Sequence, residues 1–171
     1  KTLAMSAELA DGIIVGSGVY KETIDWVHKY IDEGRTARSP ELGPIDVIFG
    51  AVISIDNDSH TARERVRARV ANRAHHNFRM TLDSVPEQHH AEIQNLLDNF
   101  DVSNWRSPKH VPLITDYILD RFTITGTADE VVERIKEIES FGVKNLMIDP
   151  PMPGFDESLE AFAKEVMPKF A

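Results

Sequence analysis

The chain has 171 residues, no cysteine, and a formal net charge of −9 from 28 acidic and 19 basic side chains. A folded chain of this length buries roughly two-thirds of its unfolded surface, so a core forms without disulfides or metals. No apolar run reaches the ~20 residues of a membrane span, no secretory signal opens the chain, and the acidic balance argues against a nucleic-acid partner, so we expect one cytoplasmic domain over residues 1–171.

Residues 1–10 have apolar side chains spaced three and four apart, which predicts a helix. The β-branched run 12–16 predicts a short buried strand, followed by a loop at Ser17 and Gly18. A second apolar stripe predicts a helix over 20–33, with Gly34 as its C-cap.

Residues 45–55 alternate strictly, and the intervening positions are also largely apolar, so we expect a strand covered on both faces. A turn at 56–59 should cap a long helix that reaches Phe78. We interpret the basic run on this helix as a solvated face because acidic and apolar residues interrupt it; its members are Arg63, Arg65, Arg67, Arg69 and Arg73.

Residues 82–112 form a polar excursion with one helical patch. A short helix follows over 114–119, and Thr127 with Glu130 forms a capping box for the next one. Residues 143–149 predict a third strand, and Asp156 opens a final helix.

The alternation of helices and strands is typical of a parallel α/β sheet with crossover helices. Only three strands are predicted, whereas a closed barrel needs eight. The chain also opens with a helix that no strand precedes. We therefore expect the C-terminal part of a larger α/β fold, from which an N-terminal portion is missing.

Three segments together carry a family resemblance: residues 1–15 with Ala10-Asp11-Gly12, residues 122–135 with Gly126-Thr127, and residues 141–168 with Pro150-Pro151 and Met167-Pro168. They resemble the luciferase-like monooxygenase superfamily, and within it the deazaflavin (coenzyme F-420)-dependent branch that includes methylenetetrahydromethanopterin reductases. The resemblance covers essentially the whole chain except the excursion.

This resemblance implies the C-terminal portion of a (β/α)8 barrel, with about three of its parallel strands and their crossover helices. It also implies an oxidoreductase that uses coenzyme F-420 or FMN for hydride transfer or monooxygenation of a small organic substrate. We expect a homodimer, a missing N-terminal barrel half, and no activity from this chain alone. Two alternatives stay open: a non-catalytic flavin-binding module and a subunit-interface half-barrel.

The resemblance places cofactor contacts at two points. The first amides of the opening helix, at Lys1, Thr2 and Leu3, would bind a phosphate, although a frayed chain end is the alternative. The loop Gly16-Ser17-Gly18 would cover the cofactor or substrate, although it is also a common plain turn. Val19 stands where sugar-phosphate dehydrogenases of this branch carry a lysine, which argues against a sugar phosphate.

No catalytic acid or base is assigned. Asp56, Asp58 and Asp149 end strands, but we interpret Asp58 as a helix cap and Asp149 as a turn former. The pairs His75-His76 and His89-His90 lack the i, i+4 spacing of zinc ligands, so we expect no metal site and interpret them as solvated or partner-facing. The excursion, which includes Trp105, either closes the substrate site or forms a passive surface loop.

Overall fold

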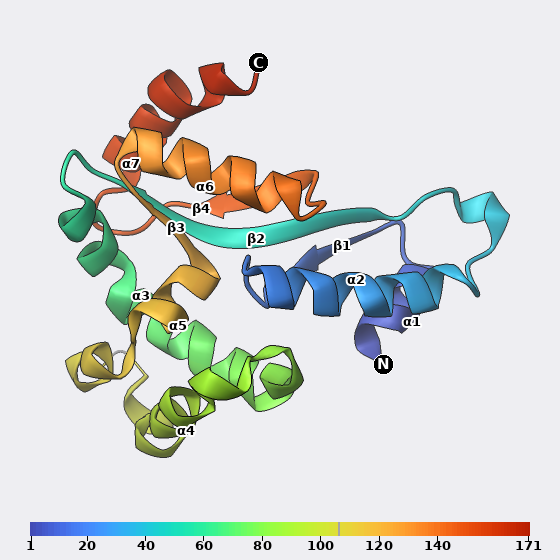
Figure 1. The fold of residues 1–171 in the computed structure, drawn as a ribbon, viewed down its shortest axis with the longest axis horizontal. Coiled ribbons are helices and arrows are strands. Elements are labelled where there is room, and N and C mark those ends of the chain that lie inside the picture. The colour runs from blue at the N-terminus through green and yellow to red at the C-terminus, as the bar shows by residue number, and fades with distance from the viewer. Residues whose placement is uncertain (106) are drawn as a thin grey trace.

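A computed structural model of the chain describes residues 1–105 and 107–171. Its elements are laid out in Figure 1. The helices are α1 (Thr2–Leu9), α2 (Lys21–Arg35), α3 (Ser59–Thr81), α4 (His90–Asn99), α5 (Asp116–Phe122), α6 (Ala128–Ser140) and α7 (Phe155–Ala161). The strands are β1 (Gly12–Val15), β2 (Asp46–Ile55), β3 (Thr123–Gly126) and β4 (Asn145–Asp149). The predicted α/β class is confirmed.

All strand pairs are parallel, and β2 pairs with each of the other strands. Ile48 lies opposite residues of both β1 and β4, and Val52 lies opposite residues of both β3 and β4. A strand has two edges, and at any position each edge pairs with only one neighbouring strand. Strand β4 therefore pairs along one edge of β2. Strands β1 and β3 follow each other along the opposite edge, so the described strands form an open sheet centred on β2.

The sequence predicts three strands, and the structure has four. The missed strand is β3, which pairs from Thr123 opposite Val52 to Gly126 opposite Ile55. It comprises only four residues between α5 and the capping box of α6. A segment this short shows no alternation, so hydrophobic periodicity does not reveal it.

Two hydrophobic clusters cover the two faces of the sheet, as predicted for 45–55. Phe49, Ala51 and Ile53 belong to the cluster that includes side chains of α2 and α6. Val52 belongs to the other cluster, which includes side chains of α3, α4 and α5. Alternate residues of β2 thus enter different cores because successive strand side chains point to opposite faces.

The end of α2 differs from the prediction. Gly34 is a buried residue within the helix, which continues to Arg35. A Cβ at Gly34 would lie 2.0 Å from the carbonyl oxygen of Ala4 and 2.7 Å from the Cβ of Ala7. Glycine is required here because α1 packs directly on the backbone of α2, and not because the helix ends.

The predicted excursion at 82–112 folds against the domain. Helix α4 contains the predicted patch, and Ile93, Leu96 and Phe100 are buried in the cluster with α3 and α5. Short 3-10 segments lie between α3 and α4 and between α4 and α5. A passive surface loop is therefore excluded for its apolar part.

Within the described residues, no helix is long and apolar enough to cross a membrane.

Candidate functional site

A cleft lies where β2 and β4 approach their C-terminal ends and α3 crosses the sheet. Its volume is about 700 Å³, within the range of small-molecule sites. The strands contribute Val52 and Asp149, which lie opposite each other in register. The lining residues are Val52, Ala68, Arg69, Asn72, Arg73, Trp105, Asp149 and Met152.

Helix α3 positions most of the polar groups of the cleft. Asp58 caps its N-terminus by accepting a hydrogen bond from the Thr61 amide at 3.0 Å, which confirms the predicted cap. The buried stripe of α3 contains Val66, Val70 and Ala74, spaced by four residues. This stripe fixes the rotation of the helix about its axis.

The arginines of α3 are not a solvated face, so that prediction is wrong. The helix lies between the sheet and α5, and its arginines bond to neighbouring elements. These bonds are Arg63 to Asp116 and Asp120, Arg65 to Asp56, Arg67 to Glu64, Asp116 and the Ile114 carbonyl, Arg69 to Asp149, and Arg73 to the Gly16 and Gly50 carbonyls. Sequence periodicity does not reveal that a helix is covered on more than one side.

Arg73 is the most buried cation of the cleft. Its Nη2 donates to the carbonyl oxygens of Gly50 at 2.7 Å and Gly16 at 3.2 Å, and its Nε donates to Gly16 at 3.3 Å. These hydrogen bonds occupy the part of the β2 edge that lies between its pairing with β1 and its pairing with β3. In the part of the chain that the structure describes, Arg73 pairs with no carboxylate and Nη1 makes no hydrogen bond. Burial lowers the pKa of Arg73, because desolvation penalises its charged form.

Arg69 forms an ion pair with Asp149 across the cleft, and both side chains are about half exposed. Asp149 was interpreted as a turn former, and the structure instead gives it this arginine partner. A half-exposed ion pair contributes little to stability. Its two partners are accordingly available to a ligand that enters the cleft.

The loop Gly16-Ser17-Gly18 ends β1 beside Arg73. Arg73 binds the Gly16 carbonyl, and Arg121 donates from Nε to the Ser17 carbonyl at 3.3 Å. Gly18 has φ +117°, and a Cβ there would lie 2.6 Å from the carbonyl oxygen of Arg121. Packing against α5 thus explains the glycine at position 18, and the cofactor role of this loop stays a prediction.

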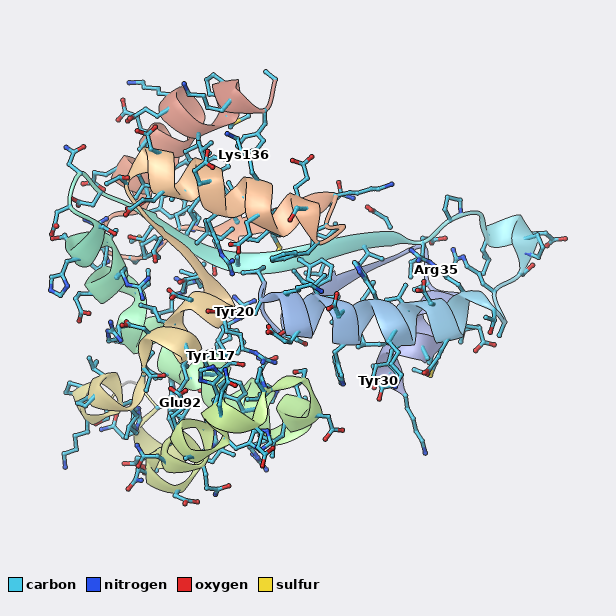
Figure 2. All side chains as sticks on the ribbon, in the orientation of Figure 1. Tyr20, Tyr30, Arg35, Glu92, Tyr117 and Lys136 are labelled. Carbon is cyan, nitrogen blue, oxygen red and sulfur yellow. The ribbon has the colours of Figure 1, made fainter. Side chains whose placement is uncertain are left out.

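Arg121 is fully buried and holds several elements together. Its Nη1 donates to the Ser84 carbonyl at 3.1 Å and to the Tyr117 hydroxyl at 3.2 Å, and its Nη2 donates to the Ser84 hydroxyl. Tyr117 packs edge-on against Tyr20, just before α2, with ring centroids 5.3 Å apart (Figure 2). Among the described residues no carboxylate pairs with Arg121, and burial lowers its pKa. Its role is structural.

Lys1, Thr2 and Leu3 lie elsewhere in the molecule. Helix α1 contacts α2 through Ala4 at Gly34, close to the C-terminal end of α2. Gly18 precedes the opposite end of α2, and the rise along that helix separates its two ends by about 20 Å. The structure therefore does not bring the two predicted groups of cofactor contacts together, and the role of Lys1 to Leu3 stays a prediction.

Several histidines are packed against rings and are not simply solvated. His75 stacks on Phe100 with centroids 4.2 Å apart, and His89 stacks on Tyr117 at 3.6 Å. His90 bonds to the Val85 carbonyl at 2.9 Å. No group of three or more histidines and carboxylates is placed to hold a metal ion in the described ranges.

Sequence reasoning missed Arg69, Asn72 and Arg73 as cleft residues. Their spacing of three and four along one helix was a signal that they share a face. The sequence did not reveal that this face of α3 lies against the C-terminal parts of β2 and β4. Trp105, which belongs to the excursion expected either to close the substrate site or to form a passive loop, lines the cleft.

Comparison with known proteins decides the family. The model of the family described as luciferase-like monooxygenase matches residues 1–145. The chain belongs to the luciferase-like monooxygenase family. The predicted resemblance is confirmed.

Curated relatives that match the chain include reductases. A 5,10-methylenetetrahydromethanopterin reductase of Archaeoglobus fulgidus is 28% identical over 173 residues, which cover 99% of this chain and 51% of that protein. The enzyme of the same name from Methanopyrus kandleri is 27% identical, with 98% of this chain and 47% of that protein covered. The chain thus spans about half the length of these relatives.

Solved structures show the same fold. The coenzyme F-420-dependent tetrahydromethanopterin reductase from Methanopyrus kandleri matches with a TM-score of 0.67 and 23% identity over 99% of this chain and 48% of that one. An F-420-dependent secondary alcohol dehydrogenase matches with a TM-score of 0.67 and 16% identity over 99% of this chain and 46% of that one. The chain therefore corresponds to part of the (β/α)8 fold of these enzymes.

Proposed function

We propose that the protein containing this chain is a flavin- or deazaflavin-dependent oxidoreductase acting on a small organic substrate. The observation that carries the proposal is the family match over residues 1–145. Relatives named as F-420-dependent enzymes and a monooxygenase named as a complex with FMN support either coenzyme F-420 or FMN. The cleft at the strand ends supplies the site, since ligands of such sheets bind at the C-terminal ends of the strands.

The residues of the cleft fit the chemistry of a flavin or deazaflavin phosphate ester. Nη1 of Arg73 makes no hydrogen bond with the described residues, and Arg69 has a partner only in a half-exposed pair. Both guanidinium groups suit an anionic group of the cofactor. Trp105, Val52 and Met152 provide apolar surface beside them. Gly16 belongs to the same site through its hydrogen bonds to Arg73.

The cofactor ring, when bound, supplies the hydride-accepting or hydride-donating centre. The chain itself binds the anionic group through Arg69 and Arg73, and Val52, Trp105 and Met152 offer apolar contacts beside it. Among the described cleft residues Asp149 is the one carboxylate, and it forms an ion pair with Arg69. We assign no proton transfer to it.

The test is a titration of oxidised coenzyme F-420 and FMN, in separate experiments, into the protein, followed by cofactor fluorescence. We expect saturable binding of one of the two. Replacement of Arg69 by Gln should weaken that binding by about tenfold, because an exposed charge-assisted bond contributes on the order of 1–1.5 kcal/mol. Arg69 is half exposed, so this change should not unfold the chain.

Arg35→Gln is the matched control. Arg35 pairs with Asp32 near the C-terminal end of α2, far from the cleft. Its replacement by Gln removes the same charge as Arg69→Gln. Equal weakening by both substitutions would mean that net charge alone controls binding and would remove the cleft from the proposal. Binding of neither cofactor to the protein would refute the oxidoreductase proposal.

We also infer that the chain associates as a homodimer. Ile14 on β1 is 59% exposed and Met147 on β4 is 44% exposed. Ile14 lies opposite Ile48 and Met147 lies opposite Gly50, so both side chains share one face of the sheet. An apolar strip on a sheet favours burial against a second copy.

A further inference from the structure

The basic side chains of helix α3 pair with carboxylates over only part of its length. In its first three turns each arginine pairs with a carboxylate: Arg63, Arg65, Arg67 and Arg69. In its last two turns stand His75, His76 and Arg79, and within the described ranges none of them pairs with a carboxylate. Arg79 therefore stands there beside two imidazoles without a counter-ion among the described residues, although the chain as a whole carries a net charge of −9.

These three residues line a hollow next to the cleft. Its volume is about 310 Å³, and it shares Asn72 and Trp105 with the cleft. Asn72, His76 and Arg79 recur at intervals of four and three residues, so they present their side chains on one face of α3. The hollow is lined by Asn72, His75, His76, Arg79, Phe100, Val102 and Trp105.

A stack of three rings makes one wall rigid. His75 lies on one side of Phe100, with centroids 4.2 Å apart and an angle of 12° between the rings. His110 lies on Phe100 at 4.1 Å and 23°, and is 2% exposed. Nε2 of His110 accepts the Asp101 amide at 3.0 Å. This wall therefore needs little ordering when a ligand binds, which favours affinity.

The nearby carboxylate is already occupied. Asp101 accepts hydrogen bonds from the Ser103 amide, the Ser103 hydroxyl and the Asn104 amide, at the start of the turn 102–104. These bonds hold the pKa of Asp101 below its usual value. The carboxylate thus stabilises its own turn, and its bonds are not directed to Arg79.

We propose that this hollow is an anion-binding site that takes a phosphate or carboxylate group of a small ligand. Arg79 and the protonated form of His75 supply the charge, and the Asn72 amide and the His76 ring supply further hydrogen bonds. An oxyanion suits this set because every charged group in the hollow is cationic and Asn72 has an N–H group to donate.

Proton uptake should accompany binding. Burial lowers the pKa of His75, and the neighbouring Arg79, His76 and His110 side chains lower it further. A bound anion adds an opposite charge beside His75 and raises that pKa. By linkage, the affinity must then rise as the pH falls through the titration range of His75.

The test is calorimetric titration of the protein with inorganic pyrophosphate and, separately, with citrate, at constant ionic strength. We expect saturable binding that, once corrected for the protonation of the ligand itself, tightens as the pH falls from about 8 to about 5.5, because the bound anion raises the lowered pKa of His75. Tighter binding of pyrophosphate identifies a phosphate site, and tighter binding of citrate identifies a carboxylate site.

Arg79→Gln and His76→Gln should each weaken binding by about tenfold. Both residues are exposed, so the substitutions should leave the fold intact. Arg35→Gln serves as the charge-matched control, because Arg35 lies on α2 far from the α3–α4 region (Figure 2) and should leave affinity unchanged. NMR titration of the His75 ring should show its pKa rising when the anion is present.

Three results would each overturn the proposal: no saturable binding near pH 6, affinity independent of pH, or equal weakening by Arg79→Gln and Arg35→Gln. The readouts do not require a bound flavin or deazaflavin. A protein that binds pyrophosphate but no flavin would therefore contradict the proposed oxidoreductase function and leave this site standing.

Discussion

Arg121 is buried and Arg73 is partly buried, and both donate to backbone carbonyls and have no carboxylate partner in the described part of the chain. Carbonyls at the ends of β1 and in β2 would lack hydrogen-bond partners without these side chains. Removing one partner of a buried hydrogen bond costs the full desolvation of the other, about 1–3 kcal/mol. The two arginines thus stabilise the junction of β1, β2 and α5.

Replacement of Arg121 by Met should therefore lower the free energy of unfolding by about 3 kcal/mol or more. The Ser17 carbonyl and both Ser84 oxygens would lose their donor inside the protein. Urea denaturation measures this change. Arg35→Met, at an exposed position, should cost less than about 0.5 kcal/mol, and a similar loss in both variants would contradict the structural role.

At the scale of elements, the close approach of α1 and α2 depends on the absence of a side chain at Gly34. Gly34 is buried in α2, and the carbonyl oxygen of Ala4 lies where its Cβ would be. Helix propensity alone would favour alanine at this position by about 1 kcal/mol. The contact with α1 opposes that preference.

Gly34→Ala should lower the free energy of unfolding by about 2 kcal/mol, because the clash outweighs the gain in helix propensity. Hydrogen exchange should show faster exchange of the α1 amides while α6 is unchanged. Glu33→Ala, at the exposed neighbouring position, should be neutral or slightly stabilising. An increase in stability for Gly34→Ala would show that α1 is not packed as described.

Elements with a strong local pattern were predictable from the sequence, and those set by tertiary contacts were not. The alternation of 45–55 and the capping box at Thr127 and Glu130 both appear as expected. The strand at 123–126 was missed because four residues carry no periodicity. The site was only partly found: Trp105 was noted, but Arg69 and Arg73 were assigned to solvent because a sequence does not reveal what covers a helix.

At the scale of the whole molecule, helices cover only part of one face of the sheet. Helix α3 covers the face containing Val52, whereas further along the same face Ile14 and Met147 are exposed. The described strands form an open sheet with β2 at its centre. Exposed apolar side chains on such a sheet favour association.

Sedimentation velocity over a concentration series should therefore show a dimer. Ile14→Lys combined with Met147→Lys should shift the population to monomer, because two charges would be buried in the interface. Met80→Lys is the matched control, since Met80 is 70% exposed on α3 and away from this strip. A monomer at all concentrations would refute the homodimer.

The placement of the two tryptophans gives the molecule a built-in optical signal. Trp26 packs edge-on against Tyr30 on α2 and belongs to the cluster on one face of the sheet. Trp105 is 45% exposed and stands between the cleft and the hollow on the other face. In a Trp26→Phe protein the remaining indole would report occupancy of either site, because a ligand there changes the polarity around Trp105 and hence its emission wavelength.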